Sequence, residues 1–236
     1  MENKLVEENK NMTLNLEPIK DNSKSQILID KNAEKIETEK INNSEWLERR
    51  AALLSPLSIS FIAIFTALSV VLGYLMAFIP NLEVFTMMIF LSGFIMSKKE
   101  GAIIGLSSAL IFTIFNPFGP SPLPLLGYQL IHYSMTGVLG GLTKDFLRNK
   151  EYFKPTEDLY IFRIMVLFGL LGAIITFFFD ILSTLFGGFT VSITIDYFIA
   201  SYLLGIVFTT VHLIGNVLVF VFLLPGLLQV IIKLID

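Results

Sequence analysis

Long apolar segments occupy nearly all of the chain after residue 55, and this feature constrains the fold more than any other. Hydrophobic residues make up 54% of the 236 residues, and charged residues only 16%. A helix needs about 20 apolar residues to cross a bilayer, and a water-soluble core is much richer in charge. We therefore predict an all-α integral membrane protein with six transmembrane helices. The expected ranges are 56–79, 82–96, 102–115, 123–142, 160–186 and 197–224.

The charged residues divide the chain into a polar head and a membrane body. Twenty of the 37 Lys, Arg, Asp and Glu residues fall within the first 50 positions. A segment so rich in charge cannot bury enough apolar surface to offset the entropy cost of ordering. It also lacks the basic start and apolar centre of a signal peptide. We predict that residues 1–50 form a disordered cytoplasmic segment and residues 51–236 the six-helix membrane domain.

Basic residues predict the orientation of that domain. The connections 80–83, 116–122 and 187–196 contain no Lys or Arg. The connections on the other side carry six basic side chains: Lys98, Lys99, Lys144, Arg148, Lys150 and Lys154. Cytoplasmic loops are enriched in Lys and Arg, so both termini are expected in the cytoplasm. Segments 82–96 and 102–115 are short for a crossing and are expected to be tilted neighbours or a shallow hairpin.

Polar side chains gather in the outer half of the expected helices. A carboxylate at the bilayer centre costs about 2.5–3.5 kcal/mol on insertion scales, so such groups usually face a bundle interior or water. Two interpretations are open: Asp180 bonds His132 or Gln129 as a packing contact, or these groups face a ligand. We favour the ligand. The candidate substrate-binding residues are Glu83, Asn116, Gln129, His132, Asp180 and Thr184.

The sixth segment also carries polar side chains, spaced four residues apart at His212 and Asn216. Counted from the expected outer end of this helix, both residues lie deeper in the bilayer than Asp180. We therefore expect them to be packing contacts between helices rather than ligands of a substrate.

The residue types that are absent limit which ligands and reactions the sequence predicts. No Lys or Arg lies in the outer half of the domain, which favours a neutral or cationic ligand over an acidic one. The lack of cysteine excludes disulfides and thiol catalysis, and we expect no metal site and no cofactor. A net charge of −3 gives no footprint for nucleic acid. Without a Walker A pattern, ATP hydrolysis would fall to a partner.

Six stretches of the membrane domain together carry a resemblance to a known family. They are AIFTA (63–67), IPNLE (79–83), GFIMSKKEGAIIGLSSAL (93–110), NPFGPSPLP (116–124), GGLTKDFL (140–147) and FFFDILST (177–184). This pattern resembles the substrate-binding S component of energy-coupling factor (ECF) vitamin transporters. The resemblance covers about residues 57–224.

The resemblance implies a function and a set of partners. It implies a six-helix protein of a prokaryotic plasma membrane that binds a vitamin or related micronutrient near its outer face. The chain itself would not be an enzyme, since two ATP-binding cassette ATPase subunits and a membrane scaffold subunit would drive uptake. Ala63 and Ala67, four residues apart, match the family's docking surface for the scaffold.

Two other functions compete with this interpretation. A stand-alone secondary transporter could couple to protons through Asp180 or Glu83, although no internal repeat is evident. A remote alternative is an intramembrane serine protease, because the stretch from Gly105 to Ser108 together with His212 resembles a Ser/His dyad. Nothing in the sequence suggests that the base lies within reach of the serine or that oxyanion donors are present.

Overall fold

The computed structural model describes residues 31, 35, 56–79, 83–116, 118–154, 157–189 and 194–235. The chain divides into two units, Met1–Leu54 and Ser55–Asp236. In the first unit only Lys31 and Lys35 are described, both in helical conformation, so the predicted disordered segment 1–50 otherwise lies outside the described residues.

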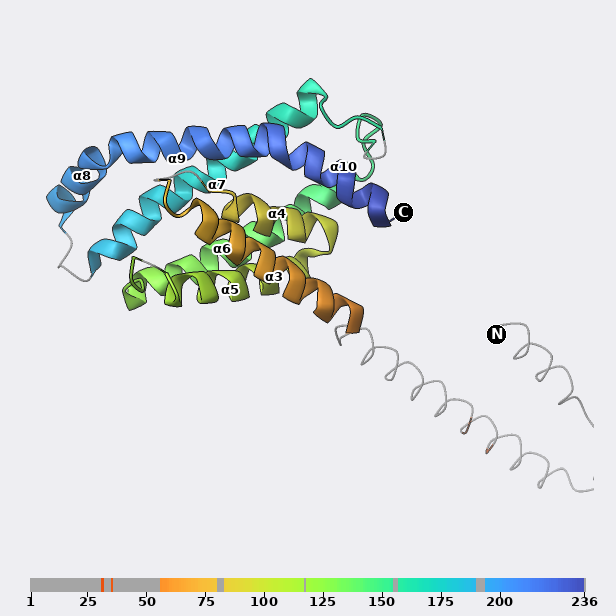
Figure 1. Cartoon of the computed structure of the whole chain (residues 1–236), viewed down its shortest axis with the longest axis horizontal. Coiled ribbons are helices and arrows are strands. Elements are labelled where there is room, and N and C mark those ends of the chain that lie inside the picture. The colour runs from red at the N-terminus through yellow and green to blue at the C-terminus, as the bar shows by residue number, and fades with distance from the viewer. Residues whose placement is uncertain are drawn as a thin grey trace, which may run out of the picture. The chain divides into compact units, whose positions relative to one another are not determined.

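Every regular element in the described part of the second unit is a helix (Figure 1). The first five are α3 (Pro56–Met76), α4 (Phe85–Ile95), α5 (Lys98–Ile114), α6 (Leu123–Leu147) and α7 (Phe162–Gly188). The last run comprises α8 (Ile195–Leu204), α9 (Ile206–Leu218), the π-helical turn η2 (Val219–Leu223) and α10 (Leu224–Ile235). The all-helical class predicted from the sequence is confirmed for these residues.

Three of these helices are long and apolar enough to cross a bilayer. They are Pro56–Met76, Phe162–Gly188 and Ile206–Leu234, with mean hydropathies of 2.2, 2.4 and 2.5. Their side chains also leave many large apolar groups exposed, as expected of surfaces that meet lipid. The chain is therefore a membrane protein by the length and composition of its helices.

The short helix α4 lies inside the unit rather than on its surface. It has 11 residues, and every residue from Phe85 to Phe94 is buried. Helices α3, α5, α6 and α10 all contact it, and Figure 1 shows it between α7 and α9 on one side and α3 and α5 on the other. At 1.5 Å per residue α4 is only about 16 Å long. Because protein surrounds it, its length need not match the thickness of a bilayer.

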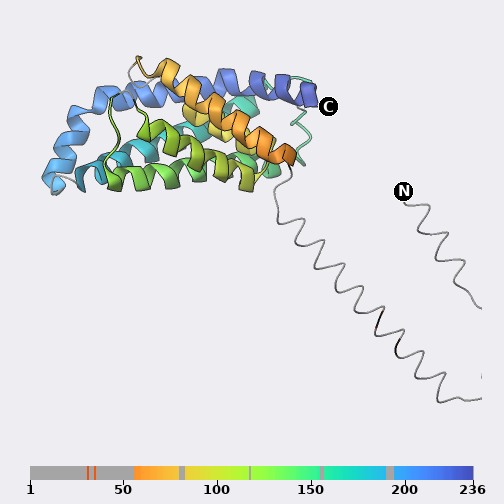
Figure 2. The same cartoon turned by 60° about the horizontal axis from the view of Figure 1, so that its bottom comes forward.

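The sixth predicted segment, 197–224, is not one continuous α-helix. Gly205 separates α8 from α9, and Figures 1 and 2 show α8 turning away from the line of α9. Further along, the helical path continues through Pro225 to Ile235. Proline cannot donate the usual backbone hydrogen bond, and the wider π-turn η2 directly before it absorbs that defect. The Tyr160 hydroxyl donates to the Phe222 carbonyl oxygen in this turn at 2.8 Å.

Two apolar clusters support the unit. The larger one centres on Phe90, whose ring lies 5.2 Å from that of Phe220 and 6.4 Å from that of Phe168, joining α4 to η2 and α7. The smaller cluster contains Phe85 and Tyr133, with ring centroids 4.9 Å apart in an edge-to-face arrangement. Edge-to-face pairs stabilise a core beyond the area they bury. Tyr133 of the smaller cluster also lines a cavity.

Glycines bring the backbones of α4, α5 and α6 into direct contact. A Cβ atom on Gly137 would collide with the carbonyl oxygen of Gly101, and one on Gly93 would collide with the carbonyl oxygen of Gly137. The same is true of Gly105 against Tyr133. Small residues allow helices to approach this closely in membrane proteins. This glycine junction fixes the positions of α4 and α6, both of which carry residues toward the site.

The glycine junction predicts a contrast between two glycines of α6. Gly137→Ala must push α5 away and should destabilise the protein by about 1–3 kcal/mol, the usual cost of overpacking. Gly127→Ala meets open space and should be neutral or slightly stabilising, because alanine favours helix over glycine. Thermal unfolding in detergent measures both effects. Equal melting temperatures for the two variants would contradict the close helix contact.

Candidate functional site

The imidazole of His212 lies between two carboxylates that come from distant parts of the chain. His212 on α9 places Nδ1 2.7 Å from Asp180 Oδ1 on α7 and Nε2 3.3 Å from Glu83 Oε1, just before α4. The His212, Asp180 and Glu83 side chains are 9%, 12% and 21% exposed. Both ring nitrogens can donate at once only when the imidazole is protonated. The geometry therefore suits an imidazolium between two carboxylates, a trio with one net negative charge.

Glu83 is the most connected member of this trio. Its Oε1 atom also accepts hydrogen bonds from the Thr86 hydroxyl and from Asn216 Nδ2, the latter at 3.4 Å. Its other oxygen, Oε2, has no hydrogen-bond partner among the described residues. The carboxylate precedes the first turn of α4, where the partial positive charge of the helix N-terminus favours an anion. Glu83 is thus held in place through Oε1.

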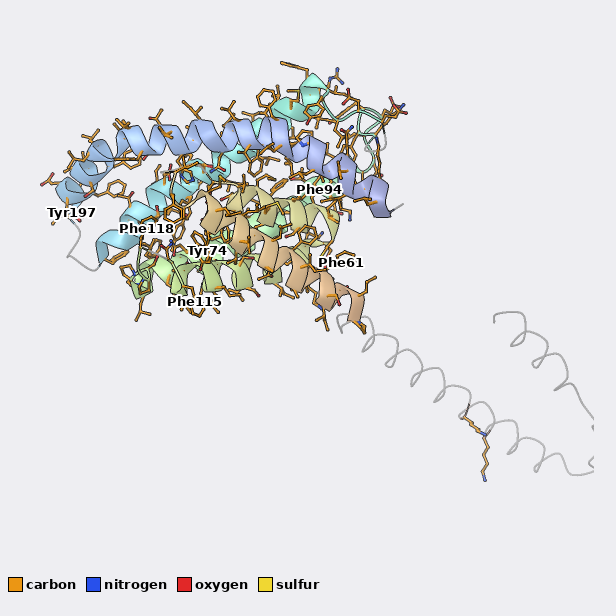
Figure 3. All side chains as sticks on the ribbon, viewed as in Figure 1. Phe61, Tyr74, Phe94, Phe115, Phe118 and Tyr197 are labelled. Atoms are coloured by element: carbon orange, nitrogen blue, oxygen red, sulfur yellow. The ribbon has the colours of Figure 1, made fainter. Side chains whose placement is uncertain are left out.

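A cavity of about 230 Å³ opens beside Glu83 and His212. Its walls come from the last turns of α3 and α5, the connection before α6, the first turns of α6, and the middle of α7 and α9. The lining residues are Gly73, Met76, Ala77, Ile79, Glu83, Phe112, Thr113, Asn116, Phe118, Ser121, Gln129, Tyr133, Phe179 and His212. Figure 3 shows Tyr74, Phe115 and Phe118 toward this end of the unit, and Phe61 and Phe94 toward the other.

Three of the predicted substrate-binding residues line this cavity: Glu83, Asn116 and Gln129. Thr113 donates its hydroxyl hydrogen to Gln129 Oε1 at 3.3 Å. Asn116 Oδ1 accepts the backbone N–H of Phe118 at 2.9 Å. Both amide oxygens therefore accept hydrogen bonds within the protein, whereas neither NH₂ group has a hydrogen-bond partner among the described residues.

The other three predicted residues do not line the cavity. Asp180 bonds His212 rather than His132 or Gln129, the partners of the packing alternative, and it does not line the cavity that the favoured ligand interpretation requires. The Tyr128 hydroxyl donates to the Phe178 carbonyl oxygen at 3.0 Å and lies 3.2 Å from His132 Nδ1. Thr184 donates to the backbone carbonyl of Asp180, four residues earlier, as threonines in helices often do.

His212 joins separate elements, as predicted, through its bonds to Asp180 and Glu83. It also lines the cavity, although the sequence predicts a depth at which it would not meet a ligand. That depth was counted along one straight helix from residue 197. Because the path bends at Gly205, His212 lies only about two helical turns from the bend. The polar spacing of His212 and Asn216 was the available signal, and Asn216 does share Glu83 with it.

Several polar atoms next to the trio are buried without a hydrogen-bond partner among the described residues. They are His132 Nε2, Thr176 Oγ1, Asp180 Oδ2 and Asn216 Oδ1. Each such atom costs about 1–3 kcal/mol of stability. No group of three or more His, Cys, Asp or Glu in the described ranges could hold a metal ion.

The alanines predicted to dock a partner lie on the outside of α3. Ala63 and Ala67 are both exposed, while their neighbours Phe65 and Thr66 are buried against the rest of the unit. Large apolar side chains flank them, with Ile64 59% and Leu68 42% exposed. The pair forms a shallow, small-residue strip on an otherwise apolar face, a surface on which another helix could pack closely.

No family model, no curated protein and no solved structure matches this chain. The function must therefore be argued from the geometry of the site and from the resemblance of its sequence stretches.

The trio predicts unequal effects for the two histidines of the chain. His212→Leu leaves two carboxylates without the cation between them and should cost about 3–5 kcal/mol, as for other broken buried ion pairs. His132→Leu breaks no ion pair. It removes the contact with the Tyr128 hydroxyl and the ring contacts with Tyr133 and Phe179, and it should cost about 1 kcal/mol. Thermal unfolding in detergent compares them.

A rescue experiment separates charge from packing. Adding Glu83→Gln and Asp180→Asn to His212→Leu removes the repulsion and should recover much of the lost stability. Equal losses for the two histidine variants, or no recovery in the triple variant, would show that the trio is not a charge-paired unit.

Proposed function

We propose that the chain is the substrate-capture subunit, or S component, of an ECF-type importer. It binds a small, water-soluble, neutral or cationic micronutrient at an outward-facing cavity and delivers it inside with a partner ATPase module. The observation that carries the proposal is the cavity itself, in which a carboxylate, an imidazole and two amides meet at one end of a helical membrane unit. Polar groups at membrane depth are costly and generally mark a ligand or ion site.

A six-crossing topology with both termini in the cytoplasm is part of this proposal. The unit has basic groups at one end: Lys98 pairs with Asp145 at 2.8 Å, and Lys144 donates to the Ile95 carbonyl at 2.8 Å. The cavity has no Lys or Arg among its lining residues. Because cytoplasmic ends are rich in Lys and Arg, the cavity end faces outward. Helix α6 has 25 residues, or about 37 Å, enough to cross despite its polar side chains.

The partners in this proposal supply the ATP hydrolysis that drives uptake. The chain itself contains no Walker A pattern, so the two ATPase subunits and the membrane scaffold supply the driving force. Ala63 and Ala67 offer the scaffold a small-residue strip on α3, and their exposure is compatible with that role. The prokaryotic plasma membrane is the location that such a complex requires.

One specific observation favours a second candidate, a proton-coupled secondary transporter. Glu83, His212 and Asp180 form a continuous chain of titratable groups beside the cavity, and such chains carry protons in pumps and transporters. Uptake without any ATPase module would select this alternative. A serine protease lacks the geometry it needs, since both nitrogens of His212 face carboxylates and Ser108 Oγ has no partner among the described residues.

The docking strip predicts a separation of transport from binding. Ala63→Leu and Ala67→Leu should abolish ATPase-dependent uptake in cells, because the larger side chain keeps the scaffold helix away. Both variants should keep normal ligand binding in the purified chain. Ala200→Leu, at an exposed alanine on α8, is the matched control and should leave uptake unchanged.

The same experiment can contradict the proposal. Normal uptake by the Ala63→Leu and Ala67→Leu variants would show that these alanines do not dock the scaffold. Uptake by the wild-type chain in cells without the ATPase module would contradict the ECF proposal as a whole.

A further inference from the structure

We propose that the cavity recognises a single-ring nitrogen heterocycle that carries an amino substituent and a positive charge. This inference rests on the proposed function and names the chemical class of its substrate. Three properties of the cavity carry it: its volume, the charge and hydrogen-bonding character of its polar groups, and its aromatic walls.

The volume suits a ligand with one ring. The cavity measures about 230 Å³, below the roughly 300 Å³ at which pockets for drug-sized ligands begin. A six-membered ring with one or two short substituents fits within it, whereas a fused three-ring system or a macrocycle would extend out of its open side.

The polar residues of the cavity include one carboxylate and two amides. Glu83 Oε1 accepts from three protein groups, and Oε2 has no hydrogen-bond partner among the described residues. The amide oxygens of Gln129 and Asn116 accept hydrogen bonds within the protein, whereas their NH₂ groups have no such partner among the described residues. A ligand matches this set when one edge offers N–H donors to the carboxylate and another offers ring-nitrogen acceptors to the amides. An amino-substituted heteroaromatic ring has both.

The charge of the site favours a cation. The trio of Glu83, His212 and Asp180 carries one net negative charge when the imidazole is protonated, and the described lining residues include no Lys or Arg. An ammonium group beside Glu83 would complete the charge balance. A carboxylate in the same place would add a second net negative charge to the trio, and the His212 imidazolium is already shared between Glu83 and Asp180.

The aromatic walls suit a flat ring. Phe112 is held by stacking on Tyr74 at 5.0 Å and by contact with Phe85 at 4.8 Å. Phe179, which lines the cavity from α7, lies 5.6 Å from Tyr133. These rings are fixed by their neighbours, so they present rigid faces rather than adaptable ones. Such faces attract flat rings through stacking and cations through the ring quadrupole.

The test uses three probes of similar size and calorimetry on the full chain in detergent. The probes are 4-amino-5-(aminomethyl)pyrimidine, its anionic analogue 4-aminopyrimidine-5-carboxylate, and benzylamine, which has the cation but no ring nitrogen. The aminomethyl probe should bind about 100-fold more tightly than the carboxylate, because of the charge pair. It should bind about tenfold more tightly than benzylamine, which lacks the ring hydrogen bonds.

A matched pair of variants tests whether the cavity causes the preference for the cationic probe. Glu83→Gln keeps the shape but removes the charge, and should lower affinity for the aminomethyl probe at least about tenfold. Asp145→Asn is the control. Asp145 lies on α6, about 24 Å along the helix from Gln129, and pairs with Lys98 at the opposite end of the unit from the cavity. This variant should leave the affinity for the aminomethyl probe unchanged.

The outcomes separate this inference from the function on which it rests. Equal or tighter binding of the carboxylate, or a preference that survives Glu83→Gln, would overturn the ligand class. The proposed function would still stand if uptake depended on the ATPase module and on Ala63. Conversely, tight binding of the aminomethyl probe together with ATPase-independent uptake would keep the ligand class and overturn the importer assignment.

Discussion

His212 holds two carboxylates from distant parts of the chain, and the arrangement of the site depends on this contact. Glu83 comes from the connection before α4 and Asp180 from the middle of α7, and neither has a Lys or Arg hydrogen-bond partner among the described residues. Without a cation between them, two carboxylates would repel each other in surroundings of low dielectric constant. The imidazole therefore ties α9, α7 and the start of α4 together and fixes one wall of the cavity.

The rest of the unit places these three groups where they meet. The glycine junction packs α4 directly against α5 and α6, and burial on all sides allows α4 to be shorter than a bilayer is thick. The start of α4 thus lies within the unit, and Glu83 is delivered to the level of His212 and Asp180. The bend at Gly205 then brings His212 close to the same end. Packing at the glycines and charge pairing at the site depend on each other.

Much of this arrangement could be predicted from the sequence, because hydropathy and charge act locally. The all-helical class followed from the apolar segments, and Glu83, Asn116 and Gln129 were placed at one end by counting from the loops. The partner of Asp180 could not be predicted in this way. It depends on a bend at one glycine, and a single glycine does not reveal whether a helix continues through it or turns. The π-turn that carries the last helix past Pro225 is a tertiary adjustment of the same kind.

The central claim is that the acidic, histidine-bridged cavity faces the outside of the cell. The chain contains no cysteine, so single-cysteine variants report position without interference. Ser121→Cys lies in the cavity lining, and Glu151→Cys lies on the connection at the opposite end. With a membrane-impermeant maleimide on intact cells, the account predicts labelling of the Ser121→Cys variant, and labelling of the Glu151→Cys variant only after permeabilisation. The reverse pattern would place the cavity inside and contradict the account.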